Sequence, residues 1–404
     1  MNELTSLGLI LLFALLVGHL VKFARIPEVT GYLLAGMIVG PSVLGWVSYE
    51  NLQALHVFSE VGLGLILFSI GAVFEFSRMR LIGRKVLTVA VAESLAAATL
   101  VFALMLALGQ PWPVALLLGA IAVETGAAST LMVIRENNAA GPFTEVVTST
   151  IGLNNILALF AFSVAAMALD MSAMLTDTGV SFRGLAQTIF PLLWQLIGST
   201  ALGFLVGLLL AIWASQVVES GEVLILLVGC VLLTVGIASA LDLSPLVGSL
   251  AVGATMANLS KKSRKLFEAL SRTDPPLYVI FFVLAGADLN LSLLPSLGLL
   301  GAAYVVGRAS GKLGGTYFAA KKVEFGDTVE RLLGLSILAQ AGLAVGLVIV
   351  TRERFPDIAP TVTTVVLGAI IVFEIAGPLS AKLALSRSGE SRPQEADELL
   401  PVEG

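Results

Sequence analysis

The chain has 404 residues, of which 57% are hydrophobic and only 13% are charged, and its net charge is −5. Its mean hydropathy is +0.96. A soluble globular domain needs more polar surface than this composition supplies, so the sequence excludes that class and favours a polytopic membrane protein. Its 40 glycines, set among apolar residues, indicate closely packed or interrupted helices.

Apolar runs close to the roughly 20 residues that cross a bilayer recur along the chain. Charged residues, prolines and glycines separate them, and no large polar domain fits between them. The pattern predicts an all-α fold with about thirteen membrane spans. The spans are expected at 5–23, 29–47, 56–75, 85–108, 112–134, 146–170, 186–214, 222–240, 243–257, 276–297, 299–320, 330–351 and 360–385.

The basic residues support this division of the chain. If the spans alternate in direction, eighteen of the 23 Lys and Arg residues fall on one side of the membrane and three on the other. The other two, Arg308 and Lys312, lie inside the eleventh span. Cytoplasmic loops are enriched in Lys and Arg. We therefore expect the N-terminus outside and the C-terminus in the cytoplasm, in a bacterial inner membrane.

Two spans are interrupted near their middle by polar residues and glycine. The fifth contains GAIAVETGAAST, with Glu124, Thr125 and Gly126, and the twelfth contains LAQAGLAVGL, with Gln340 and Gly342. Interrupted helices in corresponding positions of two halves are typical of inverted-repeat transporters, whose binding site lies near the bilayer midplane. The alternative is two glycine-tolerant packing helices.

Charged residues inside the spans need a reason, because each costs about 2.5–3.5 kcal/mol on insertion scales. Arginine stays charged at any biological pH. Arg308 is therefore expected either to compensate the negative ends of broken helices or to pair with a carboxylate, unless it snorkels or forms a purely structural pair. Lys312, four residues on, is expected to be a snorkelling or structural charge.

Three carboxyl groups lie in the apolar spans. Glu124 sits at the interruption of the fifth, where it is either the group that exchanges protons or one partner of a static pair with Arg308 or Lys312. Glu93 and Glu374 are expected to be structural partners for Arg308 or for freed backbone amides. Asn154 and Asn155, in the sixth span, can ligate a cation through their side-chain oxygens or hydrogen-bond neighbouring helices.

Several segments together give the chain a family resemblance. It resembles the CPA2-type monovalent cation:proton antiporters, relatives of bacterial sodium/proton antiporters and of potassium-efflux systems. The resemblance covers nearly all of residues 5–385. The segments that carry it are RIPEVTGYLLAGMIVGPSVLG at 25–45, GLGLILFSIGAVFEFSRMRLIGR at 62–84, SPLVGSLAVGATMANLSKKSRKLFEAL at 244–270, PLYVIFFVLAGADLNLSLL at 276–294 and AQAGLAVGLVI at 339–349.

The resemblance implies a transporter domain at 1–385 and a disordered cytoplasmic tail at 386–404. It also implies a homodimer, built through one helix bundle. A second, core bundle would contain spans 112–170 and 299–351, with the fifth and twelfth helices broken and crossing. That core would move to expose its site to each side in turn, exchanging a monovalent cation, sodium or potassium, for protons. No cofactor and no nucleic acid is expected.

The resemblance also maps a site onto particular residues. The family's carboxylate pair on the sixth helix falls on Asn154 and Asn155, its basic residue on the eleventh helix falls on Arg308, and its crossover motif falls on Thr125 and the two residues after it. The second family carboxylate is therefore absent here. The expected cation ligands are Thr125, Asn154 and Asn155, with Glu124 as the proton-binding acid. Arg308 and Lys312 would compensate charge, and Glu93, Glu374 and Gln340 are possible partners.

Replacement of the carboxylate leaves three functions open. In the first, the acid has moved to Glu124 and cation/proton antiport persists. In the second, proton coupling is lost or altered, which would give a uniporter, a channel-like protein or a carrier of another substrate. In the third, the chain is a binding or sensing relative, or an inactive one. An enzyme is disfavoured, because no nucleophile–base pair, metal cluster or phosphate loop is found in the sequence.

Overall fold

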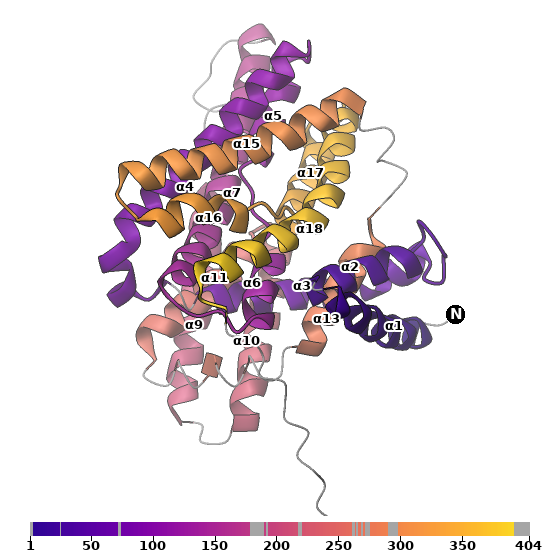
Figure 1. The fold of residues 1–404 in the computed structure, drawn as a ribbon, viewed down its shortest axis with the longest axis vertical. Helices are drawn as coiled ribbons and strands as arrows, with labels where there is room; N and C mark the ends of the chain where they lie inside the picture. Colours follow the sequence, from indigo (N-terminus) through magenta and orange to yellow (C-terminus); the bar gives the residue numbers. More distant parts are fainter. Residues whose placement is uncertain are drawn as a thin grey trace, which may run out of the picture.

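The computed structural model describes residues 3–24, 26–71, 74–177, 193–216, 220–260, 275–289 and 298–391, together with positions 190, 263, 266, 267 and 270. Within these residues all regular secondary structure is helical. The chain folds back and forth so that its helices pack side by side and cross at steep angles in the centre (Figure 1).

Each of the thirteen predicted spans coincides with a helix or with a pair of helices in line. The number of membrane crossings itself stays a prediction. The helices are α1 (Glu3–Phe23), α2 (Glu28–Val39), α3 (Tyr49–Gly71), α4 (Phe76–Ala107), α5 (Trp112–Ile121), α6 (Ala127–Glu136), α7 (Pro142–Asp177), the π-helix η2 (Trp194–Gly198), α9 (Ser199–Gln216), α10 (Ser220–Ala240), α11 (Pro245–Leu259), α13 (Pro275–Ala287), α15 (Gly298–Lys322), α16 (Asp327–Ser336), α17 (Gly342–Arg354) and α18 (Ala359–Ser388).

Four stretches within the described residues are, by length and composition, long and apolar enough to cross a bilayer. They are Gly83–Ala107, Pro142–Ser172, Trp194–Ala214 and Ala359–Ser388. Some boundaries differ from the prediction. The second span was expected to reach residue 47, but α2 ends at Val39, where the backbone of Gly40 becomes extended. Parts of three spans lie outside the described residues: 72–73 of the third, 186–189 and 191–192 of the seventh, and 290–297 of the tenth.

The packing divides the helices into two groups. One contains α1, α2, α3, α9, α10, α11 and α13, which pack mainly on one another. The other contains α4 to α7 and α15 to α18, and we call it the core group (Figure 1). Within the core group, α15 lies along α4 at close range. A Cβ at Gly315 would come 2.6 Å from Cα of Glu93, so only glycine allows this approach.

Two helices of the core group are broken, as the sequence predicts. The chain is not helical between α5 and α6, at residues 122–126, or between α16 and α17, at residues 337–341. The two breaks cross, and the amide of Gly126 donates to the carbonyl oxygen of Ala339 at 2.9 Å. Each break leaves half-helix ends with unpaired backbone groups in the middle of the molecule, and these need partners.

The end of α18 is fastened to the start of α7. The helix continues to Ser388, three residues past the predicted end of the transporter domain. Glu390, just beyond it, accepts hydrogen bonds from the amides of Phe143 and Thr144 and from the Thr144 hydroxyl, at 2.7–2.8 Å. Its carboxylate thereby caps the N-terminus of α7. Most of the predicted disordered tail, residues 392–404, lies outside the described residues.

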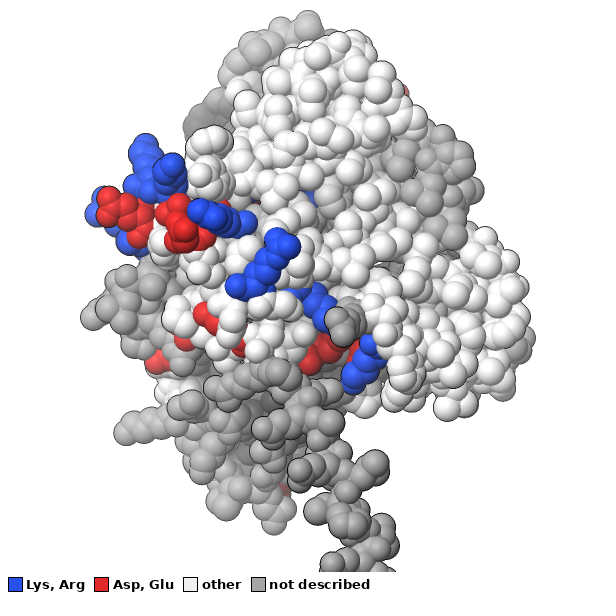
Figure 2. Space-filling model, viewed as in Figure 1, with Lys and Arg blue, Asp and Glu red and all other residues white. Residues whose placement is uncertain are grey.

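On the face shown in Figure 2, the charged side chains of the described residues gather in one band, and the described surface above it and to its right is almost entirely uncharged. The band lies where α15 ends in Lys321 and Lys322, where α16 begins, and where α18 ends. Uncharged surface of this extent matches the lipid-facing side of a membrane protein.

Candidate ion-exchange site

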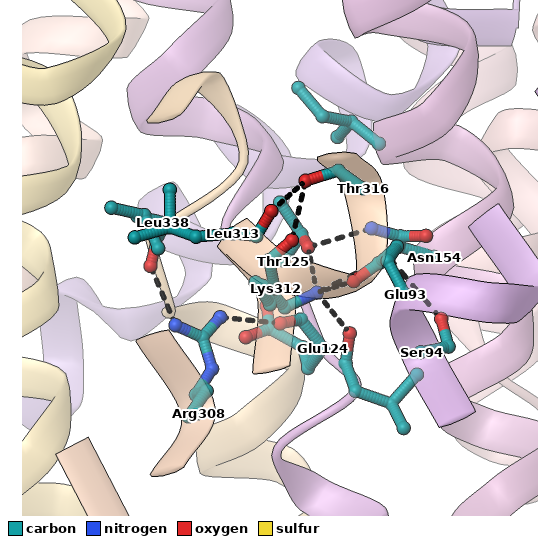
Figure 3. A network of polar contacts seen from close by, with 12 residues as sticks. Glu93, Ser94, Glu124, Thr125, Asn154, Arg308, Lys312, Leu313, Thr316 and Leu338 are labelled. Carbon is teal, nitrogen blue, oxygen red and sulfur yellow. Dashed lines mark hydrogen bonds and ion pairs between the residues drawn. The ribbon is translucent and has the colours of Figure 1, made fainter. Parts of the chain in front are cut away.

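The polar residues singled out from the sequence meet at the crossing of the two broken helices. Figure 3 shows six of them, namely Glu93, Glu124, Thr125, Asn154, Arg308 and Lys312. Glu124 and Thr125 lie in the break between α5 and α6, and Gln340 lies in the other break. α7 supplies the two asparagines and α15 supplies Arg308 and Lys312. Glu93 comes from α4 and Glu374 from α18. All of these side chains are buried, with at most 6% of the residue exposed.

Arg308 binds the carbonyl ends of two half-helices. Its guanidinium donates to the carbonyl oxygens of Leu338 at 2.6 Å, Ala339 at 3.0 Å and Glu124 at 2.6 Å. A helix C-terminus carries partial negative charge, so these bonds neutralise the ends of both α5 and α16. The guanidinium carbon also lies 4.3 Å from the ring centre of Phe373 on α18. Arg308 was expected either to compensate the ends of broken helices or to pair with a carboxylate. Among the described residues it binds the helix ends, and it forms no ion pair with a carboxylate.

Lys312 does not snorkel, contrary to one expectation. Its ammonium group is fully buried, lies 3.2 Å from a carboxylate oxygen of Glu93, and donates to the Val123 carbonyl at 2.8 Å and to Oγ1 of Thr125 at 2.9 Å (Figure 3). Glu93 was expected to serve Arg308 or free amides, but it pairs with Lys312. Since Glu93 and Lys312 are both 0% exposed, they form a buried ion pair within the site.

The asparagines contact the broken helix through Thr125. The side-chain amide of Asn154 donates to Thr125 Oγ1 at 2.9 Å, and that of Asn155 donates to the backbone carbonyls of Thr125 at 3.3 Å and Ile151 at 3.0 Å. The side-chain oxygen of Asn154 is buried and has no hydrogen-bond partner. An unpartnered buried oxygen is costly, so it is available to a cation, a water molecule or a donor.

Glu124 has a different environment from Glu93. Its carboxylate accepts from the amide of Ala341, 3.3 Å away, at the N-terminal end of α17, where the helix dipole is positive. Within the described part of the chain it forms no ion pair, because Arg308 binds its backbone carbonyl and Lys312 is held by Glu93. The carboxylate is therefore buried without a basic partner.

The remaining predicted partners complete the neighbourhood. Gln340 donates to the carbonyl of Ile121 at 3.2 Å and to the hydroxyl of Tyr304 at 2.9 Å, and its own side-chain oxygen has no partner. Glu374 accepts from the hydroxyl of Ser129, on the first turn of α6, at 2.9 Å. Tyr304 and Ser129 were not singled out from the sequence, where they resemble ordinary helix residues.

A cavity of about 290 Å³ lies beside the site, between α7 and α17 of the core group and α3, η2 and α11. Arg354, at the end of α17, lines it and forms an ion pair with Asp170 of α7. A second, separate pocket of only about 10 Å³ shares several lining residues with this cavity, among them Ser244 and Leu343, and is also lined by Asn155. The mainly apolar cavity therefore lies close to Asn155. No group of three or more His, Cys, Asp or Glu within the described residues is placed to hold a metal ion.

Comparison with known proteins agrees with this architecture. The family model described as "Sodium/hydrogen exchanger, transmembrane" matches residues 8–383. Among curated proteins, the ammonium/H(+) antiporter subunit AmhT of Alkalihalophilus pseudofirmus is 26% identical over 326 residues, which is 79% of this chain and 80% of AmhT.

Two structures of the sodium proton antiporter MjNhaP1 from Methanocaldococcus jannaschii share the fold. One was determined at pH 8, has a TM-score of 0.68 and 19% identity, and the match covers 96% of this chain and 97% of MjNhaP1. The other is an electron-microscopy structure with a TM-score of 0.70 and 18% identity, covering 97% and 99%. The predicted sodium/proton antiporter-like fold is therefore confirmed, whereas placement in the CPA2 group stays a prediction. The chain belongs to the transmembrane sodium/hydrogen exchanger family, and its activity is the exchange of a monovalent cation for protons.

Proposed function

We propose that this chain binds one dehydrated monovalent cation, sodium or potassium, and protons in turn at the crossing of its broken helices. Glu124 is the acid that exchanges them, and oxygens of Thr125, Asn154 and Asn155 complete the cation site. One observation carries this proposal. Arg308 and Lys312 are engaged elsewhere, Arg308 by carbonyl groups and Lys312 by Glu93, which leaves the Glu124 carboxylate without an ion-pair partner among the described residues.

The oxygen ligands follow from the contacts. Alkali cations bind through oxygen, which carboxylate, hydroxyl and amide side chains all provide. Asn154 offers a buried oxygen with no partner. Thr125 Oγ1 accepts from Asn154 and Lys312. A cation that reaches the Thr125 oxygen therefore displaces one of these two donors, which links cation binding to the surrounding polar contacts.

Access to the site is asymmetric in this structure. The cavity beside the site runs along α17 to the end that carries Arg354. At the other end, the Glu136 carboxylate of α6 accepts from the amide of Glu28, which begins α2, at 2.8 Å and so ties the core group to the remaining helices. With the predicted orientation, the cavity side is the outside. The structure then corresponds to an outward-facing state, and the core group moves against α2, α3 and α11 to face the cytoplasm.

Exchange at one carboxylate fixes the stoichiometry. Protonated Glu124 is neutral, and Glu124 with a bound monovalent cation is also neutral, so either form can cross with the core group without burying net charge. The ionised carboxylate without a cation carries a desolvation cost, so the core group does not cross in this form. This gives one proton for one cation, an electroneutral cycle, and a solid-supported-membrane measurement should detect no steady current beyond the leak.

Family membership favours antiport over the alternative of lost or altered proton coupling, and over an enzymatic function. Similarity to AmhT adds ammonium to the candidate ions, since it carries the same single charge and could donate to the Asn154 and Thr125 oxygens. We also propose a homodimer in a bacterial inner membrane, with the N-terminus outside and the C-terminus in the cytoplasm, as the resemblance and the distribution of basic residues indicate.

The test is transport by the purified protein in proteoliposomes with an imposed pH gradient. Sodium, potassium, lithium or ammonium is added, and collapse of the gradient is followed with a pH-sensitive dye against empty vesicles. Glu124→Gln should abolish cation-dependent collapse, whereas Glu222→Gln, at an exposed position on α10, should transport as the parent does. A parent that moves no proton with any of these cations refutes the function. A Glu124→Gln variant as fast as the parent refutes the site.

A further inference from the structure

Glu374 of α18 is a buried carboxyl group that the proposed exchange cycle does not use. It is 4% exposed, and both of its carboxyl oxygens lie 2.9 Å from the hydroxyl oxygen of Ser129, on the first turn of α6. That hydroxyl has one hydrogen, so it serves one of the two oxygens at a time. Among the described residues, no Lys or Arg forms an ion pair with this carboxyl group.

The charged groups around Glu374 are committed to other partners. On α15, Arg308 is bound to three carbonyl groups and Lys312 is paired with Glu93. In the break between α5 and α6 lies another acid, Glu124, and the facing break offers neutral Gln340. A carboxylate buried without a cation costs several kcal/mol, whereas the neutral acid does not, so this site holds a proton.

Glu374 also occupies a turn of α18 that touches both broken helices. The ring of Phe373, one residue before it, stacks on Arg308. Gly377 packs so closely on the second break that a Cβ there would come 2.6 Å from Cα of Ala339. Pro378 has no N–H to bond the Glu374 carbonyl, which loosens the helix at this turn. A charge on Glu374 therefore acts directly on the crossing.

We propose that Glu374 is a second proton-binding site, separate from the cation site, whose occupancy sets the alkaline limit of exchange. The proton comes from water and returns to it: the O–H bond of the acid breaks, and the carboxylate keeps the electron pair. With the proton bound, Glu374 is neutral and Arg308 stays on the carbonyl ends. Once the proton leaves, the carboxylate attracts Arg308, whose Nε has no partner, and the half-helix ends lose their compensation.

This inference rests on the proposed exchange activity, and the test measures the pH profile of that activity. Sodium- or potassium-driven proton flux is recorded across a pH series in proteoliposomes of the parent, Glu374→Gln, Ser129→Ala and a control, Thr364→Ala. Thr364 is a half-buried residue on the same helix whose hydroxyl donates to the Pro360 carbonyl. Glutamine fixes the neutral state. We expect Glu374→Gln to continue exchange at pH values where the parent has lost at least tenfold in rate.

Ser129→Ala provides a graded change in the same direction. It removes the one hydroxyl that stabilises the ionised acid, so the alkaline limit should move up by about 0.5–1 pH unit. Thr364→Ala should superimpose on the parent. A Glu374→Gln or a Ser129→Ala profile that superimposes on the parent would overturn the proposal and leave Glu374 a structural acid.

A second measurement covers the case in which Glu374→Gln fails to fold. Infrared difference spectra between neutral and alkaline pH should show loss of a carboxylic-acid C=O band in the parent, shifted in Ser129→Ala. The same band in both without a shift overturns the assignment. A wrong assignment of the exchange site would be distinguishable from a wrong role for Glu374. It would appear as undiminished flux in Glu124→Gln, and it would leave the pH profile of Glu374→Gln and the carboxylic-acid infrared band unchanged.

Discussion

The buried pair of Glu93 and Lys312 gives the sharpest prediction for stability. The charges are 3.2 Å apart and neither is exposed. At an effective dielectric constant of about 20, two unit charges at this distance attract by about 5 kcal/mol. Much of that offsets desolvation of the two groups, so the intact pair contributes little net stability, but removal of one partner leaves a buried charge and costs about 3–5 kcal/mol.

We therefore expect Glu93→Gln to lower the unfolding temperature of the detergent-solubilised protein. With an unfolding entropy of about 2.1 cal/mol/K per residue, 404 residues give about 0.85 kcal/mol/K, so the loss corresponds to about 4–6 °C. Tm is measured from tryptophan fluorescence at a fixed scan rate. Lys312 keeps its bonds to Val123 and Thr125 in this variant, so the loss reports the missing charge.

Two comparisons make the result decisive. The double variant Glu93→Leu/Lys312→Met removes both charges and should recover most of the lost Tm. Asp327→Asn breaks the exposed Asp327–Arg331 pair and should change Tm by less than about 1 °C. The reasoning fails if Glu93→Gln is as stable as the parent, or if the double variant is no better than the single one.

Two further predictions concern the compensating arginine and the contact between α6 and α2. Arg308→Lys replaces the planar guanidinium by a single ammonium group, which cannot bind all three carbonyl oxygens. We therefore expect proton flux in proteoliposomes to fall at least tenfold. A variant with the flux of the parent would exclude the compensating role of Arg308. Glu136 lies two residues past the predicted fifth span, and burial raises the pKa of its carboxyl above the ordinary 4.5. The folded protein then binds this proton more tightly than the unfolded chain, so Glu136 lowers stability progressively as pH rises above about 4.5. The Tm of Glu136→Gln relative to the parent should increase between pH 4 and pH 7, and a difference that is constant or decreasing would contradict this.

The sequence predicts the fold well because the bilayer restricts it. In lipid a continuous segment satisfies all of its own backbone groups only as a helix, so each long apolar run becomes a helix, and the two runs interrupted by Glu124–Gly126 and Gln340–Gly342 become the broken ones. Helix ends were harder to predict. Residues 40–47 are as apolar as a helix, but the backbone leaves the helix at Gly40, and α2 stops at Val39.

The partners within the site could not be predicted, because they depend on how the helices cross. The sequence suggests Arg308 as a partner for Glu93. In the structure Lys312, one helical turn further along α15, is the basic residue that reaches Glu93. The carbonyl groups that hold Arg308 carry no sequence signal at all, because any residue can supply them. Ser129 likewise becomes relevant only when α18 brings Glu374 to the first turn of α6.

The four half-helix ends explain why so many charges are tolerated here. The C-terminal ends of α5 and α16 are negative and receive Lys312 and Arg308. The N-terminal end of α17 is positive and receives Glu124. Each charge therefore offsets a dipole that the break itself creates. A bound cation or proton changes the charge of Glu124, so it directly changes how well the positive end of α17 is compensated. Because the two backbone breaks that form the site belong to helices of the core group, occupancy of the site acts on the whole core group.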